Sequence, residues 1–104
     1  MKHSFEIKIC GINNQVSMNA AINIGVNYIG LVFYHKSPRN LSITRAELLT
    51  KNRTKNSKIV ALTVNPDDIL LQKIIEYINP DYIQLHGEEH LSDVKILEIN
   101  LTFP

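Results

Sequence analysis

Four short apolar segments follow one another along this 104-residue chain, and each leads into a stretch with helical spacing. The expected strands cover residues 5–10, 28–33, 58–64 and 82–85, and the expected helices, caps included, cover 14–24, 42–49, 65–78 and 88–98. Four strand–helix units in succession predict parallel strands joined by right-handed crossovers, which is an α/β fold. Asn14 and Ser42 are suitable N-terminal caps, and Gly25 is a suitable stop for the first helix.

We expect each helix to turn one apolar side toward the sheet. The residues expected on these sides are Val16, Ala20, Ala21, Ile24, Leu48, Leu49, Ile69, Leu70, Ile74 and Ile78. Asn65 is expected to cap the third helix, with Pro66 in its first turn. A chain of this length predicts a single domain over residues 1–104, with 98–104 as an irregular tail.

Composition and charge argue against several classes of protein. The formal net charge is +1, with 44% hydrophobic and 20% charged residues, and basic residues do not cluster with aromatic ones as they do in nucleic-acid binders. No apolar stretch approaches the roughly 18 residues that span a bilayer, and charges interrupt the apolar N-terminus. The single cysteine cannot form an internal disulfide. We therefore expect a cytoplasmic protein with neither a nucleic-acid nor a membrane partner.

Metal and nucleotide cofactor sites are not predicted. His3, His35 and His90 have no partner at metal-ligand spacing, and the chain lacks the glycine-rich phosphate motifs.

Candidate functional residues gather at the carboxyl ends of the expected strands, where parallel α/β folds bind their ligands. Cys10 ends the first strand, Arg39 lies in the loop after the second, Asn65 follows the third, and His86 follows the fourth. Because these ends meet at one edge of a parallel sheet, the convergence of the four residues predicts a ligand site there.

Each of these residues also has an ordinary structural explanation. A lone cysteine such as Cys10 is often a small apolar core residue, although a thiolate can act as a general base. Arg39 can hold a carboxylate or phosphate with paired hydrogen bonds, or simply be solvated in its loop. Asn65 is explained by helix capping, and Glu88 and Glu89 by the charge preference of a helix N-terminus.

Gln84 and His86 are two residues apart in the fourth expected strand, so they lie on one face of it, and Leu85 lies on the other. A histidine at a strand end is usually a hydrogen-bonded structural residue, but this pair could also line the mouth of a barrel. Alternation alone does not decide between these explanations.

Four segments together resemble the phosphoribosylanthranilate isomerase family. They are Lys8-Ile9-Cys10-Gly11-Ile12, Gly30-Leu31-Val32-Phe33 leading to Ser37-Pro38-Arg39, Val60-Ala61-Leu62-Thr63-Val64-Asn65, and Ile83-Gln84-Leu85-His86-Gly87-Glu88-Glu89. The resemblance covers roughly residues 5 to 97 and implies the N-terminal half of a TIM (β/α)₈ barrel. It also implies an enzyme of tryptophan biosynthesis that needs no cofactor or metal.

The activity implied by this resemblance is an Amadori rearrangement. N-(5′-phosphoribosyl)anthranilate becomes 1-(2-carboxyphenylamino)-1-deoxyribulose 5-phosphate, so the enzyme is an intramolecular oxidoreductase of the aldose–ketose isomerase type. By resemblance, Cys10 is the general base, Arg39 holds the anthranilate end of the substrate, and Gln84 and His86 form the wall of the site.

The same resemblance implies that part of the site is missing. The family's general acid is an aspartate of the fifth strand, and its phosphate site uses the loops after strands seven and eight. None of the aspartates Asp67, Asp68, Asp81 and Asp93 matches that motif. We therefore expect no activity from this chain alone.

The alternative to an isomerase is an inactive remnant, or a half barrel that needs a complementary chain. A four-unit half barrel leaves open strand edges and an uncovered sheet face, which favour pairing with another chain. The expected partners are thus a homodimer or a complementary half barrel, besides the small phosphosugar–anthranilate substrate.

Overall fold

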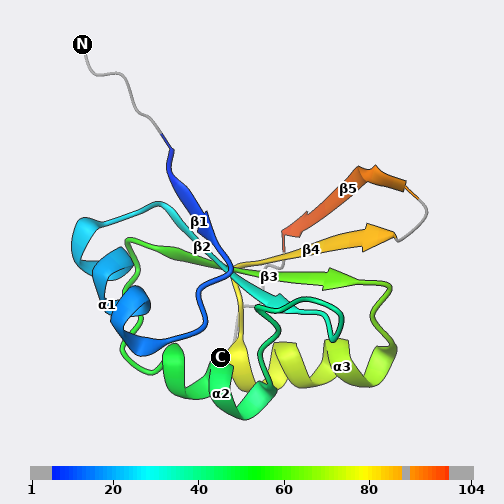
Figure 1. Ribbon diagram of the computed structural model, residues 1–104, viewed down its shortest axis with the longest axis horizontal. Coiled ribbons are helices and arrows are strands. Elements are labelled where there is room, and N and C mark those ends of the chain that lie inside the picture. The colour runs from blue at the N-terminus through cyan, green and yellow to red at the C-terminus, as the bar shows by residue number, and fades with distance from the viewer. Residues whose placement is uncertain (1–5, 88–89, 99–104) are drawn as a thin grey trace.

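A computed structural model describes residues 6–87 and 90–98, the last of these as backbone. One sheet holds five strands in the order β1-β2-β3-β4-β5. Strands β1 (Lys8–Cys10), β2 (Tyr28–Phe33), β3 (Lys58–Val64) and β4 (Tyr82–Gly87) are parallel to one another, and β5 (His90–Glu98) is antiparallel to β4. The helices lie on one side of this sheet (Figure 1). The predicted α/β fold with four parallel strands is therefore confirmed.

The predicted fourth helix over residues 88–98 is wrong, because residues His90–Glu98 form β5 instead. Leu91, Val94 and Leu97 have helical spacing, but Val94 and Ile96 also alternate as in a strand. A strand that returns antiparallel needs only a short turn, and it supplies hydrogen-bond partners to the edge of β4. These edge hydrogen bonds outweigh a weak helical pattern. Of the predicted tail, Glu98 ends β5, and residues 99–104 lie outside the described part.

The first two helices begin and end as predicted. Helix α1 (Gln15–Ile24) is capped by Asn14, whose side chain accepts a hydrogen bond of 2.8 Å from the Ser17 backbone N–H. It stops at Gly25, which adopts the left-handed conformation with φ +80°. Helix α2 (Ile43–Leu49) is capped by Ser42, whose hydroxyl accepts a 3.1 Å hydrogen bond from the Arg45 N–H. Each cap satisfies a backbone donor that the helix itself leaves unpaired.

The third helix is capped by Asp67, not by Asn65 as predicted. Helix α3 (Asp68–Lys73) continues directly into the π-helical turn η1 (Ile74–Ile78), and the Asp67 carboxylate accepts a 2.8 Å hydrogen bond from the Leu70 N–H. A capping residue needs an extended backbone, whereas Asn65 is left-handed with φ +44°. The Asn65 N–H instead donates to the His86 carbonyl, 2.9 Å away, which ties the end of β3 to β4.

The helix faces were predicted only in part. Ala21, Leu49, Ile74 and Ile78 are buried as expected, together with Met18, whereas Val16 is 81% exposed and Ile24 72% exposed. Leu48 and Ile69 also lie mostly in solvent. A short helix contacts the sheet through only a narrow stripe of side chains. The predicted helix faces were wider than this stripe, so they included residues that point into solvent.

The core lies between the helices and one face of the sheet. Alternate strand residues are fully buried there, because successive side chains of a strand point to opposite faces. The buried residues of this layer are Ile29, Leu31, Phe33, Ile59, Ala61, Thr63 and Ile83 from the strands and Met18, Ala21, Ala46, Leu49, Ile74 and Ile78 from the helices. Within the described residues, no helix has the length and apolar character required to cross a membrane.

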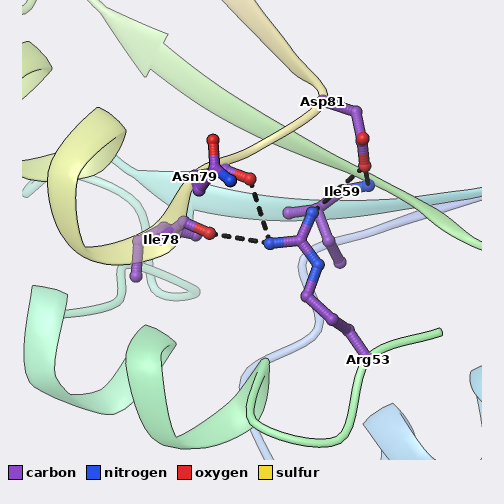
Figure 2. Close-up of polar contacts among 5 residues, drawn as sticks. All are labelled: Arg53, Ile59, Ile78, Asn79 and Asp81. Atoms are coloured by element: carbon purple, nitrogen blue, oxygen red, sulfur yellow. Dashed lines mark hydrogen bonds and ion pairs between the residues drawn. The ribbon is translucent and has the colours of Figure 1, made fainter. Parts of the chain in front are cut away.

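Arg53, in the loop between α2 and β3, joins three parts of the fold (Figure 2). Its guanidinium donates to the carbonyls of Ile78 at 2.7 Å and Asn79 at 3.0 Å, where η1 ends. It also pairs with the Asp81 carboxylate at 3.1 Å, and that same carboxylate oxygen accepts from the Ile59 N–H at 2.8 Å. A cation at a helix C-terminus is favourable, so this contact fixes η1 against the starts of β3 and β4.

Candidate active site on the open face of the sheet

The site residues predicted on the strands project from the face of the sheet opposite to the helices, here called the open face. In the parallel register, Cys10 is opposite Gly30, Leu62 is opposite Gln84, and Val64 is opposite His86. Paired residues of a parallel sheet point to the same side, and so do residues two apart in one strand. Cys10, Gln84 and His86 therefore share this face.

Cys10 ends β1 and is exposed. A Cβ added to Gly30 on the adjacent strand would lie 3.0 Å from the Cys10 Sγ and 2.7 Å from the Leu62 Cδ1. The absence of a side chain at Gly30 thus leaves room for the thiol on the open face. This accessible position is compatible with the chemistry expected of Cys10.

Arg39 reaches back from the loop after β2 to the residue that follows Cys10. A Cβ added to Gly11 would overlap the Arg39 Cδ and would lie 2.8 Å from its Nε, so the arginine side chain crosses directly over the Gly11 backbone. Gly11 also has φ +81°, a conformation that glycine adopts without steric cost. The cation candidate, 29 residues after the base candidate in sequence, therefore lies against the residue that follows Cys10.

Gln84 and His86 are hydrogen-bonded to each other on the open face. The Gln84 side-chain nitrogen lies 2.8 Å from His86 Nε2, and the Gln84 side-chain oxygen accepts a 2.7 Å hydrogen bond from the Lys8 ammonium. Gln84 is only 8% exposed, and its backbone carbonyl accepts from the buried Thr63 hydroxyl at 3.1 Å. Both predicted residues thus belong to one polar chain that starts at Lys8.

Lys8 is a residue that the sequence analysis did not single out as functional. The signal was present, because Lys8 is two residues before Cys10 and hence on the same face of the strand. Its partner could not be recognised from the sequence, since Gln84 lies 76 residues further along the chain.

The remaining polar residues at the carboxyl ends are not part of this cluster. Asn65 lines a cavity of about 550 Å³ between the loops after β2 and β3, together with Asp67 and Lys73. His35 lines the same cavity, and its ring packs edge-on against Tyr34 at 5.4 Å. His3, Glu88 and Glu89 lie outside the described residues.

The amino-terminal end of the open face carries a second cavity of about 300 Å³. Glu6, Lys8, Tyr28, Val60, Tyr82 and Gln84 line it. The Tyr28 hydroxyl donates a 3.2 Å hydrogen bond to the Glu6 carboxylate, and the negative charge of Glu6 raises the pKa of Tyr28. The Tyr28 and Tyr82 rings meet edge to face at 6.0 Å. Lys8 and Gln84 thus connect this cavity with the polar chain that ends at His86, while the thiol and the imidazole of the candidate site lie toward the carboxyl end.

The family model described as N-(5′phosphoribosyl)anthranilate (PRA) isomerase matches residues 7–103. The chain belongs to the phosphoribosylanthranilate isomerase family. It is 37% identical over 99 residues to the N-(5′-phosphoribosyl)anthranilate isomerase of Chelativorans sp. and 40% identical over 86 residues to that of Parvibaculum lavamentivorans. These alignments cover 95% and 83% of this chain but 45% and 40% of the relatives.

Solved phosphoribosylanthranilate isomerases have the same fold over the matched part. One, in complex with reduced 1-(o-carboxyphenylamino)-1-deoxyribulose 5-phosphate, is 29% identical and superposes with a TM-score of 0.75 over 82% of this chain and 44% of that one. Another, described as mutually generated monomers of the dimeric enzyme from Thermotoga maritima, is 30% identical with a TM-score of 0.74 over 82% and 43%. The chain thus spans less than half the length of these relatives, and its parallel strands form the N-terminal half of a (β/α)₈ barrel.

Proposed function

We propose that this chain carries the base-bearing half of a phosphoribosylanthranilate isomerase site. In this proposal Cys10 is the general base, Arg39 holds the carboxylate of the anthranilate ring, and Gln84 and His86 form the opposite wall. The observation that supports it most directly is the Arg39 side chain crossing the Gly11 backbone. That contact brings a side chain able to bind a carboxylate to the residue after Cys10, which supports a role for Arg39 in holding an anthranilate-bearing sugar.

The proposed reaction needs a proton acceptor at the sugar carbon next to the imine. After the ribose ring opens to the protonated imine, the Cys10 thiolate takes the proton from C2′. The electron pair of that C–H bond forms the C1′=C2′ double bond of the enolamine, and the π pair of the imine moves to nitrogen. Return of a proton to C1′ and loss of the hydroxyl proton yield the ketone at C2′. No electrons leave the substrate, so the step is an isomerisation that needs no redox partner.

Two parts of the reaction have no residue in this chain assigned to them. Ring opening requires a general acid, and the 5′-phosphate requires its own ligands; we propose that both come from a complementary chain or from a second copy of this one. The exposed side chains of Ile7, at 49%, and Ile9, at 37%, support this proposal, since they flank the unpaired edge of β1. The cytoplasmic location of the protein also remains a prediction.

The decisive experiment measures turnover of phosphoribosylanthranilate by the purified chain, followed through the loss of its fluorescence. The chain is assayed alone over a range of concentrations and then mixed with a chain that supplies the second half of a family barrel. Activity that appears in either assay and disappears in Cys10→Ala supports the proposal. Activity that survives Cys10→Ala would remove Cys10 as the base.

A binding titration separates an incomplete site from an inactive remnant. The probe is reduced 1-(o-carboxyphenylamino)-1-deoxyribulose 5-phosphate, the compound bound in a solved relative. We expect Arg39→Gln to weaken binding at least tenfold and Arg45→Gln, a surface arginine of α2, to leave it unchanged. Equal affinities of Arg39→Gln and the unsubstituted chain, or no binding in any folded sample, would favour the remnant.

A further inference from the structure

The hydrogen-bond chain Lys8–Gln84–His86 determines which nitrogen of the His86 ring carries the proton. A lysine ammonium has three donors and no acceptor, so the Gln84 atom that faces Lys8 at 2.7 Å must be the amide oxygen. The amide NH₂ of Gln84 then faces His86 Nε2 at 2.8 Å. An amide nitrogen only donates, so Nε2 of His86 must be the acceptor, and the ring proton must reside on Nδ1.

Burial makes this orientation costly to reverse. Gln84 is 8% exposed, and turning its amide over would place the NH₂ group against the Lys8 ammonium. Two donors would then face each other across this part-buried contact, so the amide oxygen stays toward Lys8 and the NH₂ group toward His86. The Thr63 hydroxyl, which donates to the Gln84 backbone carbonyl at 3.1 Å, further fixes the strand at this position.

We infer that Lys8 is a positioning residue which, through the Gln84 amide, holds His86 as the Nδ1–H tautomer. The donor that the ring then offers is Nδ1–H, which suits an oxygen acceptor of a ligand, such as a carboxylate, a hydroxyl or a carbonyl. The use of that donor on an anthranilate-bearing sugar rests on the proposed function. The tautomer itself does not, because it follows from the contacts within the free chain.

The test is long-range ¹H–¹⁵N NMR on the chain labelled at histidine nitrogen, recorded at alkaline pH, where imidazole side chains are uncharged. The chain has four histidines, so His3, His35 and His90 serve as internal references. The expected His86 pattern is a protonated Nδ1 and an unprotonated Nε2. A protonated Nε2 in the unsubstituted chain would overturn the inference without any variant.

Three substitutions identify the cause of the tautomer. Lys8→Met keeps a long unbranched side chain but removes the donor, so we expect a mixture of His86 tautomers, and Lys8→Arg should restore Nδ1–H. Gln84→Glu replaces the amide with a carboxylate, which only accepts, so the proton should move to Nε2. The control is Lys58→Met, an exposed lysine on the same face of β3, which should change nothing.

The outcomes keep this inference separate from the proposed function. An unchanged His86 tautomer in both folded Lys8→Met and folded Gln84→Glu would overturn the positioning role of Lys8. An Nδ1–H tautomer that responds to these substitutions would support Lys8 as positioning residue, and absence of turnover even after mixing with a chain that supplies the second half of a family barrel would count against the proposed activity alone.

Discussion

Replacing Arg53 with methionine should destabilise the fold more than any other exchange of a surface cation. The side chain makes three contacts: with the Ile78 carbonyl at 2.7 Å, the Asn79 carbonyl at 3.0 Å and the Asp81 carboxylate at 3.1 Å (Figure 2). These contacts join η1 to the starts of β3 and β4. Methionine retains most of the apolar stem but donates no hydrogen bond, so the substitution isolates the polar contribution.

The size of the effect follows from the exposure of the groups. Each carbonyl hydrogen bond contributes about 1 kcal/mol to the free energy of unfolding. The Arg53 and Asp81 side chains are 26% and 36% exposed, so solvent screens their ion pair and about 0.5 kcal/mol is appropriate for it. Arg53→Met should therefore lose about 2.5 kcal/mol. Asp81→Asn should lose about 0.5 kcal/mol, because the asparagine oxygen can still accept from the Ile59 N–H.

Equilibrium urea unfolding followed by far-ultraviolet circular dichroism measures these differences, since the chain has no tryptophan to report by fluorescence. The matched control is Arg45→Met, whose guanidinium makes only a long 3.5 Å contact with the Asn13 carbonyl. It should lose no more than about 0.5 kcal/mol. An Arg53→Met loss no larger than that of Arg45→Met would refute the argument that the loop arginine fixes η1 to the sheet.

Two further substitutions test the geometry of the open face. Gly11→Ala and Gly25→Ala should each lower the free energy of unfolding by about 1–2 kcal/mol in urea, since both glycines have nearly the same positive φ. Only Gly11→Ala should shift the Arg39 Nε–H resonance in NMR spectra, because only Gly11 lies against the Arg39 side chain. An Arg39 resonance that moves equally in both variants would contradict the proposed contact. Glu6→Gln should lower the pKa of Tyr28, because it removes the carboxylate charge that raises this pKa. Titration of the Tyr28 ring signals by NMR measures the change, and an unchanged titration curve would exclude Glu6 as the cause.

Strand positions were predictable where apolar runs end sharply. Strands β2 and β3 have the predicted bounds, Tyr28–Phe33 and Lys58–Val64, because each run is buried on the helix side and flanked by polar residues. Strand β1 is shorter than predicted, covering only Lys8–Cys10, since its pairing with β2 begins at Lys8, opposite Tyr28, the first residue of β2. The local apolar pattern predicts the ends of a strand where burial sets them, but not where hydrogen bonding to a neighbouring strand sets them.

Candidate site residues on the strands were also predictable. Alternation placed Gln84 and His86 on one face, and the strand ends identified Cys10. The Arg39 contact with Gly11 depends on the path of a loop, and the Lys8 contact with Gln84 depends on the curvature of the sheet across four strands. The apolar periodicity of a sequence specifies neither the path of a loop nor the curvature of a sheet, so these two contacts could be recognised only from the structure.

The antiparallel strand β5 constrains how the second half of a family barrel could join this chain. A closed (β/α)₈ barrel needs a parallel partner on both outer strands of this half, β1 and β4. The edge of β4 is already occupied by β5, whose residues Ile96 and Leu97 pair with Gln84 and Ile83. Among the described residues no strand pairs with the outer edge of β1, which is flanked by the exposed Ile7 and Ile9. In the proposed assembly, a complementary chain would add to β1 without rearrangement, but it would have to displace β5 to complete the site beside Gln84 and His86.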